Sequence, residues 1–380
     1  MKRNNKEKEL PPLNRIYQGH CLDFLKSLPD ECIDMVVTSP PYCCLRDYGE
    51  MVSTVWDEDI GCNHKWNGNH GKGFCFTCNA WYGQLGLEPT IELYIKHLCD
   101  IFDEIKRVLK REGTCWVNMG DTYSGSSNGS NDYKTEKSKN YSNKEQYQEK
   151  YNGQKAGKTS LPDKCLLQIP SRFAIEMTNR GWILRNEIIW HKPNSLPSSV
   201  KDRFTVDFEK IFFFTRNKKY YFEPQYEPWG KDEREAGIVR ARKYGYSGKG
   251  TYQDWYFNQR EKRDWVAGNK NLKEGMLACR GKREMKPPLI HPLGRNKRCV
   301  WRVPTRPFKE AHFATFPEAL IETPIKVGCP ESGVVLDPFM GSGTVAVVAR
   351  RLGRNFIGIE LNPAYIEIAL KRFKDAGFVE

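Results

Sequence analysis

A strand, a glycine-containing turn and a helix follow one another near the C-terminal end of the sequence, and this unit constrains the fold most strongly. The apolar run 334–336 leads into residues 337–344 (DPFMGSGT), and helical spacing of apolar residues continues over 344–352. A second strand is expected over 355–359 and ends at Glu360. Glycines in such a turn let a ligand approach the backbone closely. The unit predicts an α/β fold with a ligand beside the turn.

Two carboxylates flank this turn. Asp337 ends the first strand and Glu360 ends the next, where an acid can accept both hydroxyls of a ribose. The pattern Gly341-x-Gly343-x-x-Ala346 also fits a dinucleotide site, so an NAD-dependent oxidoreductase is one alternative. A packing turn without a ligand is another. However, Asp337 would repel a pyrophosphate, and it better suits a cationic ligand such as the amino and sulfonium groups of S-adenosylmethionine.

The rest of the chain favours the same fold class. A helix is expected over 90–110, where apolar residues recur at helical spacing. The other expected elements are strands at 33–38, 114–119, 183–190 and 209–215 and helices at 165–180 and 363–373. Strands that alternate with helices predict a mostly parallel sheet.

The strand at 33–38 ends at Ser39-Pro40-Pro41-Tyr42. The two prolines remove two backbone N–H groups and stiffen the loop. The remaining hydroxyl, carbonyl groups and aromatic ring suit an exocyclic amino group on a planar base. Acceptors on the amine hydrogens favour the tetrahedral nitrogen that attacks a methyl donor, and Tyr42 can stack on a base that has left the duplex. In most proteins such a loop is only a turn, but the glycine turn in the same chain favours the functional interpretation.

The charge of the chain favours a polyanionic partner. The 60 Lys or Arg and 47 Asp or Glu residues give a net charge of +13. Residues 230–310 hold 21 basic and 9 acidic residues, interleaved with aromatic ones such as Trp255 and Trp301. This combination suits phosphate contacts and base stacking, and a solvated, poorly structured segment is the alternative. Residues 124–160 are polar and nearly free of aliphatic residues, which predicts a flexible surface loop.

Four of the metal-binding side chains form two close pairs. Cys62-x-His64 and Cys75-x-x-Cys78 suit tetrahedral zinc, and the polar residues between the pairs cannot form a core of their own. With four protein ligands, the site is expected to be structural, in an insert over roughly 56–82. Unligated thiols are the alternative, and His70 could replace His64.

The sequence also predicts where the protein is located. No run of 18 or more apolar residues is present, and the charged first residues have no apolar stretch behind them. These features predict a cytoplasmic protein without a membrane partner, whose cysteines are thiols or metal ligands.

The Ser-Pro-Pro-Tyr loop, the turn at Asp337 and the segment 181–203 resemble the β group of S-adenosylmethionine-dependent DNA amino-methyltransferases. These enzymes methylate N4 of cytosine or N6 of adenine. The resemblance implies a Rossmann-like sheet of seven mostly parallel strands, with the catalytic loop before the cofactor turn in a circularly permuted order. It also implies a catalytic half at 14–222, a target-recognition region at 223–305 and a cofactor-binding half at 306–380.

The same resemblance implies a role for each matching residue. Ser39, Pro40, Pro41 and Tyr42 are expected to hold and activate the amine. The residues expected to bind S-adenosylmethionine are Asp337, Phe339, Gly341, Gly343 and Thr344 around its methionine and sulfonium part, Glu360 at the ribose, and Phe316 and Pro317 along the pocket. The family often has an acid after the glycine at position 19. Here His20 stands in that place and could approach the adenine.

Serine at position 39 resembles the cytosine-N4 enzymes more than the adenine-N6 enzymes. Cytosine in double-stranded DNA is therefore the expected substrate, with adenine-N6 methylation by the same mechanism as the alternative. An RNA substrate and a catalytically silent DNA-binding protein are further alternatives. A homodimer and a cognate restriction enzyme are left open as partners.

Overall fold

A computed structural model describes residues 8–43, 52–59, 61–67, 73–125, 161–228, 294–306 and 316–378. The expected flexible loop at 124–160 lies almost wholly outside these described residues, as does most of the expected recognition region at 223–305. His70, the alternative zinc ligand, also lies outside them.

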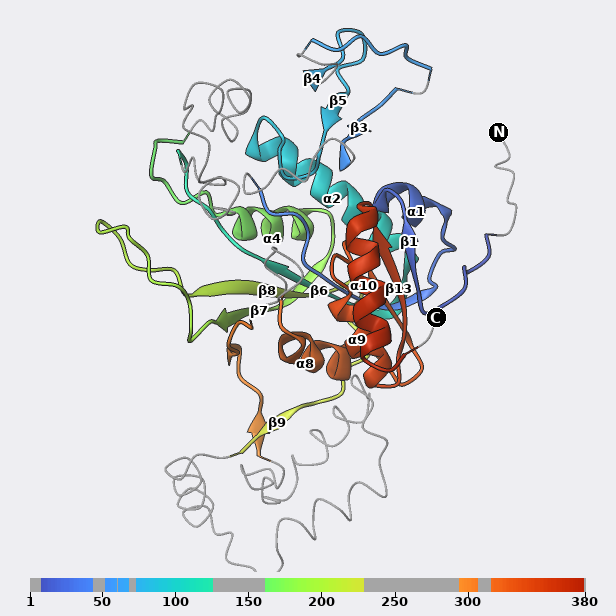
Figure 1. Cartoon of the computed structure of the whole chain (residues 1–380), viewed down its shortest axis with the longest axis vertical. Coiled ribbons are helices and arrows are strands. Elements are labelled where there is room, and N and C mark those ends of the chain that lie inside the picture. The colour runs from blue at the N-terminus through green and yellow to red at the C-terminus, as the bar shows by residue number, and fades with distance from the viewer. Residues whose placement is uncertain are drawn as a thin grey trace, which may run out of the picture.

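An eight-stranded sheet forms the centre of the fold, in the order β1-β13-β12-β2-β6-β8-β7-β11 (Figure 1). Its strands are β1 (Arg15–Gln18), β2 (Ile33–Thr38), β6 (Leu109–Met119), β7 (Ile183–His191), β8 (Phe208–Thr215), β11 (Val300–Arg302), β12 (Val334–Asp337) and β13 (Asn355–Glu360). All neighbouring strands pair in parallel except β8, which runs antiparallel to both β6 and β7. The prediction of an α/β fold with a mostly parallel sheet is confirmed.

The sheet has one strand more than the seven expected. The additional strand at the edge, β11, pairs in parallel with β7 and places Trp301 opposite Trp190. Trp301 is only 8% exposed and belongs to the same buried cluster as Trp190 and Ile188. Trp301 is one of the aromatic residues that the sequence predicts to stack on bases. For Trp301 that prediction is wrong, because its ring is part of the core.

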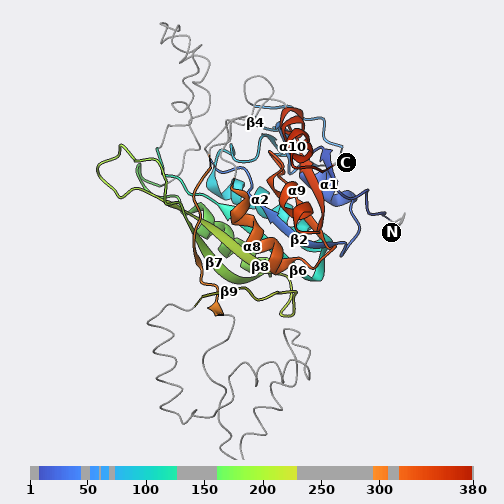
Figure 2. The same cartoon turned by 60° about the horizontal axis from the view of Figure 1, so that its bottom comes forward.

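Helices cover both faces of the sheet. They are α1 (Cys21–Ser27), α2 (Ile91–Val108), α4 (Ile169–Asn179), α8 (Glu318–Gly328), α9 (Thr344–Arg351) and α10 (Pro363–Asp375). The first three contribute to one buried cluster and the last three to another. Figure 2 shows α8 and α9 on one side of the sheet and α2 on the other. Val36 and Val37 belong to different clusters because neighbouring strand residues point to opposite faces. Strands buried on both faces are apolar throughout, and this made β2 recognisable in the sequence.

Helix α2 shows how the sequence determines an element and its ends. The helix begins after Thr90, whose hydroxyl accepts a hydrogen bond from the backbone N–H of Leu93 at 3.2 Å. It buries one apolar face and ends at Val108. The next strand, β6, begins directly at Leu109, five residues earlier than predicted, because Leu109 already pairs with Ile33 of β2.

Two small sheets lie outside the central one. The first comprises β3 (Thr54–Trp56), β5 (Trp81–Gly83) and β4 (Gly73–Phe74), all antiparallel, and lies beyond α2 at the top of Figure 1. It begins two residues before the insert expected at 56–82 and ends one residue after it. The second pairs β9 (Tyr226–Glu227) with β10 (Arg295–Asn296). Among the described helices, none combines the length and the apolar composition that a bilayer span requires.

Candidate active site

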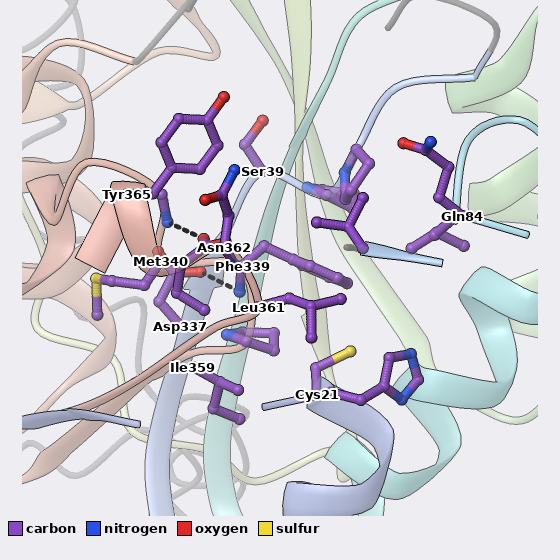
Figure 3. Close-up of a pocket in the computed structure, with 18 of the residues that line it drawn as sticks. Cys21, Ser39, Gln84, Asp337, Phe339, Met340, Ile359, Leu361, Asn362 and Tyr365 are labelled. Carbon is purple, nitrogen blue, oxygen red and sulfur yellow. Dashed lines mark hydrogen bonds between the residues drawn. The ribbon is translucent and has the colours of Figure 1, made fainter. Parts of the chain in front are cut away.

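A cavity of about 360 Å³ opens at the carboxyl ends of β2, β12 and β13. This volume lies within the range of small-molecule pockets, about 300–1,000 Å³. Ser39, Pro40, Pro41 and Tyr42 form one side, and the turn that starts at Asp337 forms another. Figure 3 shows Ser39, Phe339, Leu361 and Asn362 gathered around this space. The two motifs, almost 300 residues apart in sequence, therefore share one site because β2 and β12 are neighbours.

Asp337 is buried at the base of the cavity, where β12 ends. Its Oδ1 accepts a 2.6 Å hydrogen bond from the hydroxyl of Thr38 and a 3.0 Å bond from the backbone N–H of Phe339. Both bonds go to the same oxygen, which leaves Oδ2 for a ligand. Burial raises the pKa of Asp337 to about 7, although the two hydrogen bonds lower it. The site therefore favours a cation, whose charge would offset the cost of burying the carboxylate.

Glu360 holds the turn in place with both carboxylate oxygens. Oε2 accepts a 2.8 Å hydrogen bond from the backbone N–H of Gly341, and Oε1 accepts one of 2.8 Å from Asn362. Burial raises the pKa of Glu360, and the backbone N–H groups act in the opposite direction. Each oxygen has a second lone pair, so the carboxylate can accept hydroxyl groups as well.

Gly341 and Gly343 of the turn have different structural roles. Gly341 has a φ of +52° and lines the cavity, and an added Cβ there would find no atom closer than 3.9 Å. Gly343 has a φ of +78°, and its Cβ would lie 2.9 Å from that of Ala369 in α10. Gly341 therefore leaves room beside a ligand, whereas Gly343 permits close packing between the turn and α10.

The remaining residues expected at the cofactor divide into two groups. Phe339, Thr344, Phe316 and His20 line the cavity, and burial lowers the pKa of His20. His20 follows β1, whose last residue pairs with Glu360, so the histidine lies beside that acid. In contrast, Pro317 and Gly343 are not among the residues that line this cavity; Pro317 is the N-cap of α8.

Contacts on both sides of the Ser-Pro-Pro-Tyr loop fix its shape. The Tyr94 hydroxyl of α2 donates a 2.8 Å hydrogen bond to the carbonyl oxygen of Pro41. A Cβ at Gly86 would lie 2.9 Å from the carbonyl oxygen of Tyr42, and one at Gly120 would lie 2.6 Å from the Tyr42 ring. The backbone therefore approaches Tyr42 closely from two directions.

The Tyr42 hydroxyl connects the loop to two strands. The Ser39 hydroxyl donates to it at 3.3 Å, and it donates at 2.8 Å to Oε2 of Glu209 at the start of β8. Oδ1 of Asn118 in β6 lies 3.2 Å from the same oxygen. Lys192 forms an ion pair with Oε1 of Glu209. Glu209 itself lines the cavity.

Sequence reasoning missed several residues of the cavity. They include Glu209, Trp56, Asn362 and Tyr365. A signal was present for Asn362, which caps α10 before Pro363 by accepting a 3.0 Å hydrogen bond from the N–H of Ala364. No local pattern marks Glu209 or Trp56, because tertiary contacts place them in the cavity.

The predicted zinc ligands lie together. The ligand atoms of Cys62, His64, Cys75 and Cys78 all lie within 4.8 Å of one another. The sulfurs of Cys62 and Cys75 are 3.8 Å apart, and the Cys78 sulfur is 3.4 Å from Nδ1 of His64. A tetrahedral ion with Zn–S bonds of 2.3 Å requires sulfurs about 3.8 Å apart. The cluster therefore has the donors and spacing that zinc needs, with His64 as the histidine.

A buried network joins the β3–β5 insert to the cavity. His97 of α2 is fully buried and stacks on Trp56 and Trp81, with ring centroids 4.7 and 5.6 Å away. Its Nδ1 lies 3.1 Å from Oε1 of Glu88, and its Nε2 lies 3.3 Å from Oδ2 of Asp57. Trp56 also lines the cavity, so the fold of the insert affects one of the cavity walls.

Comparisons with known proteins identify the family. The N6_N4_Mtase model, described as DNA methylase, matches residues 33–371. The chain is 33% identical to the type II methyltransferase M.Cfr9I of Citrobacter freundii, over 94% of this chain and 87% of that protein. It is 32% identical to the type II methyltransferase M.SmaI of Serratia marcescens, over 94% and 90%. A solved cytosine-N4-specific PvuII DNA methyltransferase is 16% identical with a TM-score of 0.48, over 96% and 86%.

The family model and the two type II relatives confirm the family that the loop and the turn predicted, and they exclude the NAD-dependent alternative. The chain belongs to the N6_N4_Mtase family of DNA methylases and is a DNA methyltransferase that uses S-adenosylmethionine.

Proposed function

We propose that this enzyme transfers a methyl group to the exocyclic N4 of cytosine in double-stranded DNA, and that the target base leaves the duplex to reach the cavity. The observation that supports the proposal most directly is the shared cavity. The Ser-Pro-Pro-Tyr loop faces the same space as Asp337, and the Thr38 hydroxyl bonds the two together.

The cavity fits S-adenosylmethionine. Oδ2 of Asp337 faces the cationic methionine and sulfonium part, Glu360 accepts the ribose hydroxyls, and His20 approaches the adenine. The other proposed contacts are Phe339, Gly341, Thr344 and Phe316, which line the cavity, and Gly343 and Pro317, which directly adjoin lining residues in the sequence. When bound, S-adenosylmethionine supplies a methyl group on a positively charged sulfur, which a nitrogen nucleophile can attack.

The chain holds the amine on the opposite side. The Ser39 hydroxyl oxygen and the carbonyl oxygen of Pro40 accept the two amine hydrogens, Pro41 fixes the loop through its bond from Tyr94, and Tyr42 supports the base. With both hydrogens held, the nitrogen lone pair is less delocalised into the ring and can attack in line. Positioning of this kind converts the encounter into an effectively unimolecular step.

Serine at position 39 favours cytosine over adenine, as in the enzymes that the loop resembles. Adenine-N6 methylation is the second candidate, because its amine presents the same geometry to the same acceptors. The two candidates differ in the methylated base, which nucleoside analysis identifies directly.

The edge of the sheet at the cavity offers a surface for duplex DNA. The connection between β7 and β8 ends next to Glu209, and in it Phe204 is 98% exposed and Leu196 is 88% exposed. Lys201 and Arg203 flank this apolar tip. Apolar side chains with basic neighbours suit insertion between base pairs beside phosphate contacts. The basic region at 223–305 remains our proposal for target recognition, between a catalytic half at 14–222 and a cofactor half at 306–380.

We also propose that Cys62, His64, Cys75 and Cys78 bind one structural zinc ion. The donor types and the 3.8 Å sulfur separation support it. The insert has little core of its own, so the metal would stabilise it and, through Trp56, the cavity wall.

The names of the relatives support a role in restriction–modification. Both are called type II methyltransferases, and we propose a cognate restriction enzyme as the partner in the same cytoplasm. A homodimer is the further assembly that we propose to test.

The function is tested by nucleoside mass spectrometry. Purified enzyme is incubated with S-adenosylmethionine and duplex DNA of mixed sequence, and Ser39→Ala is the control. N4-methylcytosine that disappears in the variant supports the proposal. N6-methyladenine would retain the mechanism and overturn the choice of base. Cofactor binding without any methylated base would indicate a silent binder or, if RNA is methylated instead, a different substrate.

A further inference from the structure

The hydroxyl groups of the catalytic loop form a chain that ends at a carboxylate. Ser39 donates to Tyr42 at 3.3 Å, and Tyr42 donates to Oε2 of Glu209 at 2.8 Å. The second distance is that of a good O–H···O bond, and the first is long, as catalytic hydrogen bonds often are before substrate binds. The loop therefore has a hydrogen-bonded connection to Glu209 on β8.

The direction of these bonds follows from the donors available. A tyrosine hydroxyl has one hydrogen, and Glu209 and Asn118 both offer acceptors to it. The carboxylate is the stronger acceptor and the closer one, so the hydrogen of Tyr42 points to Glu209. Tyr42 then accepts from Ser39, which leaves the lone pairs of the Ser39 oxygen for a substrate amine.

Glu209 is held in place for this role. Lys192 pairs with its Oε1, while Oε2 faces Tyr42. The Lys192 ammonium also lies 4.4 Å from the centroid of the Trp190 ring, which orients it. Lys192 and Tyr42 thus hold one oxygen each of the Glu209 carboxylate.

We propose that Glu209 is the terminal proton acceptor of a relay from the target amine through Ser39 and Tyr42. This inference rests on the proposed function, because it requires an amine in the cavity. As the new nitrogen–carbon bond forms, the carbon–sulfur bond breaks and its electron pair stays on sulfur. The nitrogen then loses one proton to the Ser39 oxygen, Ser39 passes its own proton to Tyr42, and Tyr42 passes its proton to Oε2 of Glu209.

The relay also affects the methyl transfer itself. Hydrogen bonds in a chain polarise one another, so a carboxylate at the far end makes the Ser39 oxygen a better acceptor for the amine hydrogen. General-base assistance of this kind typically contributes about 10²- to 10⁴-fold in rate. Glu209 therefore acts on the reaction through two hydroxyl groups without touching the base.

The test separates proton acceptance from positioning. Glu209→Gln keeps an oxygen that can accept from Tyr42 but cannot take up its proton, and Glu209→Ala removes both functions. We expect Glu209→Gln to lower the single-turnover rate of methyl transfer about 100-fold or more, while the dissociation constants for DNA and S-adenosylmethionine stay within about threefold. Glu187→Gln, which removes an exposed carboxylate of β7 paired with Lys210, is the matched control.

Two further readouts distinguish a relay from a structural contact. The single-turnover rate of the wild-type enzyme should fall at acid pH, and Glu209→Gln should lose this dependence. Tyr42→Phe should lower the rate of methyl transfer about as much as Glu209→Gln does. The double variant should be no slower than the slower single variant, because each change interrupts the same chain of hydrogen bonds.

The outcomes are distinct. A Glu209→Gln enzyme near the wild-type rate with an unchanged pH profile overturns the relay, even if Glu209→Ala is slow, because Glu209 then only positions Tyr42. A wild-type enzyme that binds DNA and cofactor but transfers no methyl group overturns the proposed function itself.

Discussion

The Thr38 hydroxyl donates a 2.6 Å hydrogen bond to Oδ1 of Asp337, and this bond links the residue before the catalytic loop to the first residue of the cofactor turn. The two residues lie at the ends of neighbouring strands, β2 and β12, and both are buried. Any change in the charge of Asp337 is therefore transmitted directly to the strand that carries Ser39.

Removing this bond should weaken cofactor binding in a pH-dependent way. Thr38→Val keeps the shape of the side chain but removes a hydrogen bond that lowers the pKa of Asp337. We expect roughly tenfold weaker binding of S-adenosylmethionine at pH 7 by isothermal titration calorimetry, with a smaller deficit at pH 8.5, where Asp337 is ionised in either protein. Thr215→Val, a buried threonine of β8 far from the cavity, should lack this pH-dependent deficit. An equal deficit at both pH values would contradict the explanation.

The affinity for S-adenosylmethionine should itself rise with pH through neutrality. Burial raises the pKa of Asp337 to about 7, so below that pH the carboxyl group is protonated and no longer attracts a cation. Affinity should fall up to about tenfold per pH unit below pH 7 and level off above pH 8. Asp337→Asn should bind about 100-fold more weakly above pH 8 and without this slope, and an identical slope in the variant would assign it to another group.

The same carboxyl group should make the ligand-free protein less stable as pH rises. The pKa of Asp337 in the folded state exceeds its unfolded value of 3.8, so the folded state binds the proton more tightly. This contribution to the free energy of unfolding is fully present below about pH 4 and is lost as the pH rises to about 7. Asp337→Asn should therefore raise the Tm of the ligand-free protein at pH 8 but abolish the increase that the cofactor causes. Thermal unfolding with and without S-adenosylmethionine measures both effects, and a lower Tm of the variant at pH 8 would be the contrary result.

Alanine at the two turn glycines should have unequal effects. Both positions have positive φ, which costs a non-glycine residue about 1 kcal/mol. Only Gly343→Ala also places a methyl group 2.9 Å from Ala369, so it should lower the free energy of unfolding by about 2–3 kcal/mol, against about 1 kcal/mol for Gly341→Ala. Urea unfolding of the two variants checks the order, and equal losses would show that α10 moves away freely.

Zinc should be bound in a ratio of one ion per chain. Elemental analysis of the purified protein should find it, and Cys75→Ser or Cys78→Ser should remove it and lower the Tm. Cys299→Ser, an exposed cysteine outside the cluster, should keep the metal. A metal-free wild-type protein with the same Tm in the presence of a chelator would show that the four side chains are unligated.

The exposed tip between β7 and β8 should contribute to DNA binding. Phe204→Ala should weaken binding of duplex DNA several-fold. It should also reduce the fluorescence of a 2-aminopurine placed at the target position, because a smaller fraction of the target bases is flipped out of the duplex. Ile175→Ala on α4 removes another exposed apolar side chain and is the control. If both variants bind and flip the base equally well, the tip has no such role.

The parts of the fold that were predictable are those determined locally. β2, β12 and β13 are apolar runs, α2 has a regular apolar stripe, and the loop and turn motifs mark the ends of their strands. The parallel sheet then follows from the alternation of strands and helices. As a result, most of the predicted site residues lie in one cavity.

The missed parts depend on contacts between distant segments. β11 is only three residues long and is a strand because it pairs with β7, more than 100 residues earlier. Glu209 belongs to the site because β8 runs antiparallel and brings its first residues to the edge where the parallel strands end. Trp56 reaches the cavity through its stacking on His97. No short sequence pattern encodes any of these arrangements.

The pairing of β1 with β13 determines when the edge of the sheet and the cofactor pocket can form during folding. Arg15 lies opposite Ile357, so β1 finds its only sheet neighbour, among the described strands, more than 300 residues later in the chain. Contacts so distant in sequence form late. His20 follows β1 and Glu360 ends β13, so these two residues of the cofactor pocket come together only when the two strands pair. The pocket for the methyl donor therefore becomes complete only after β13 has been translated and has paired with β1.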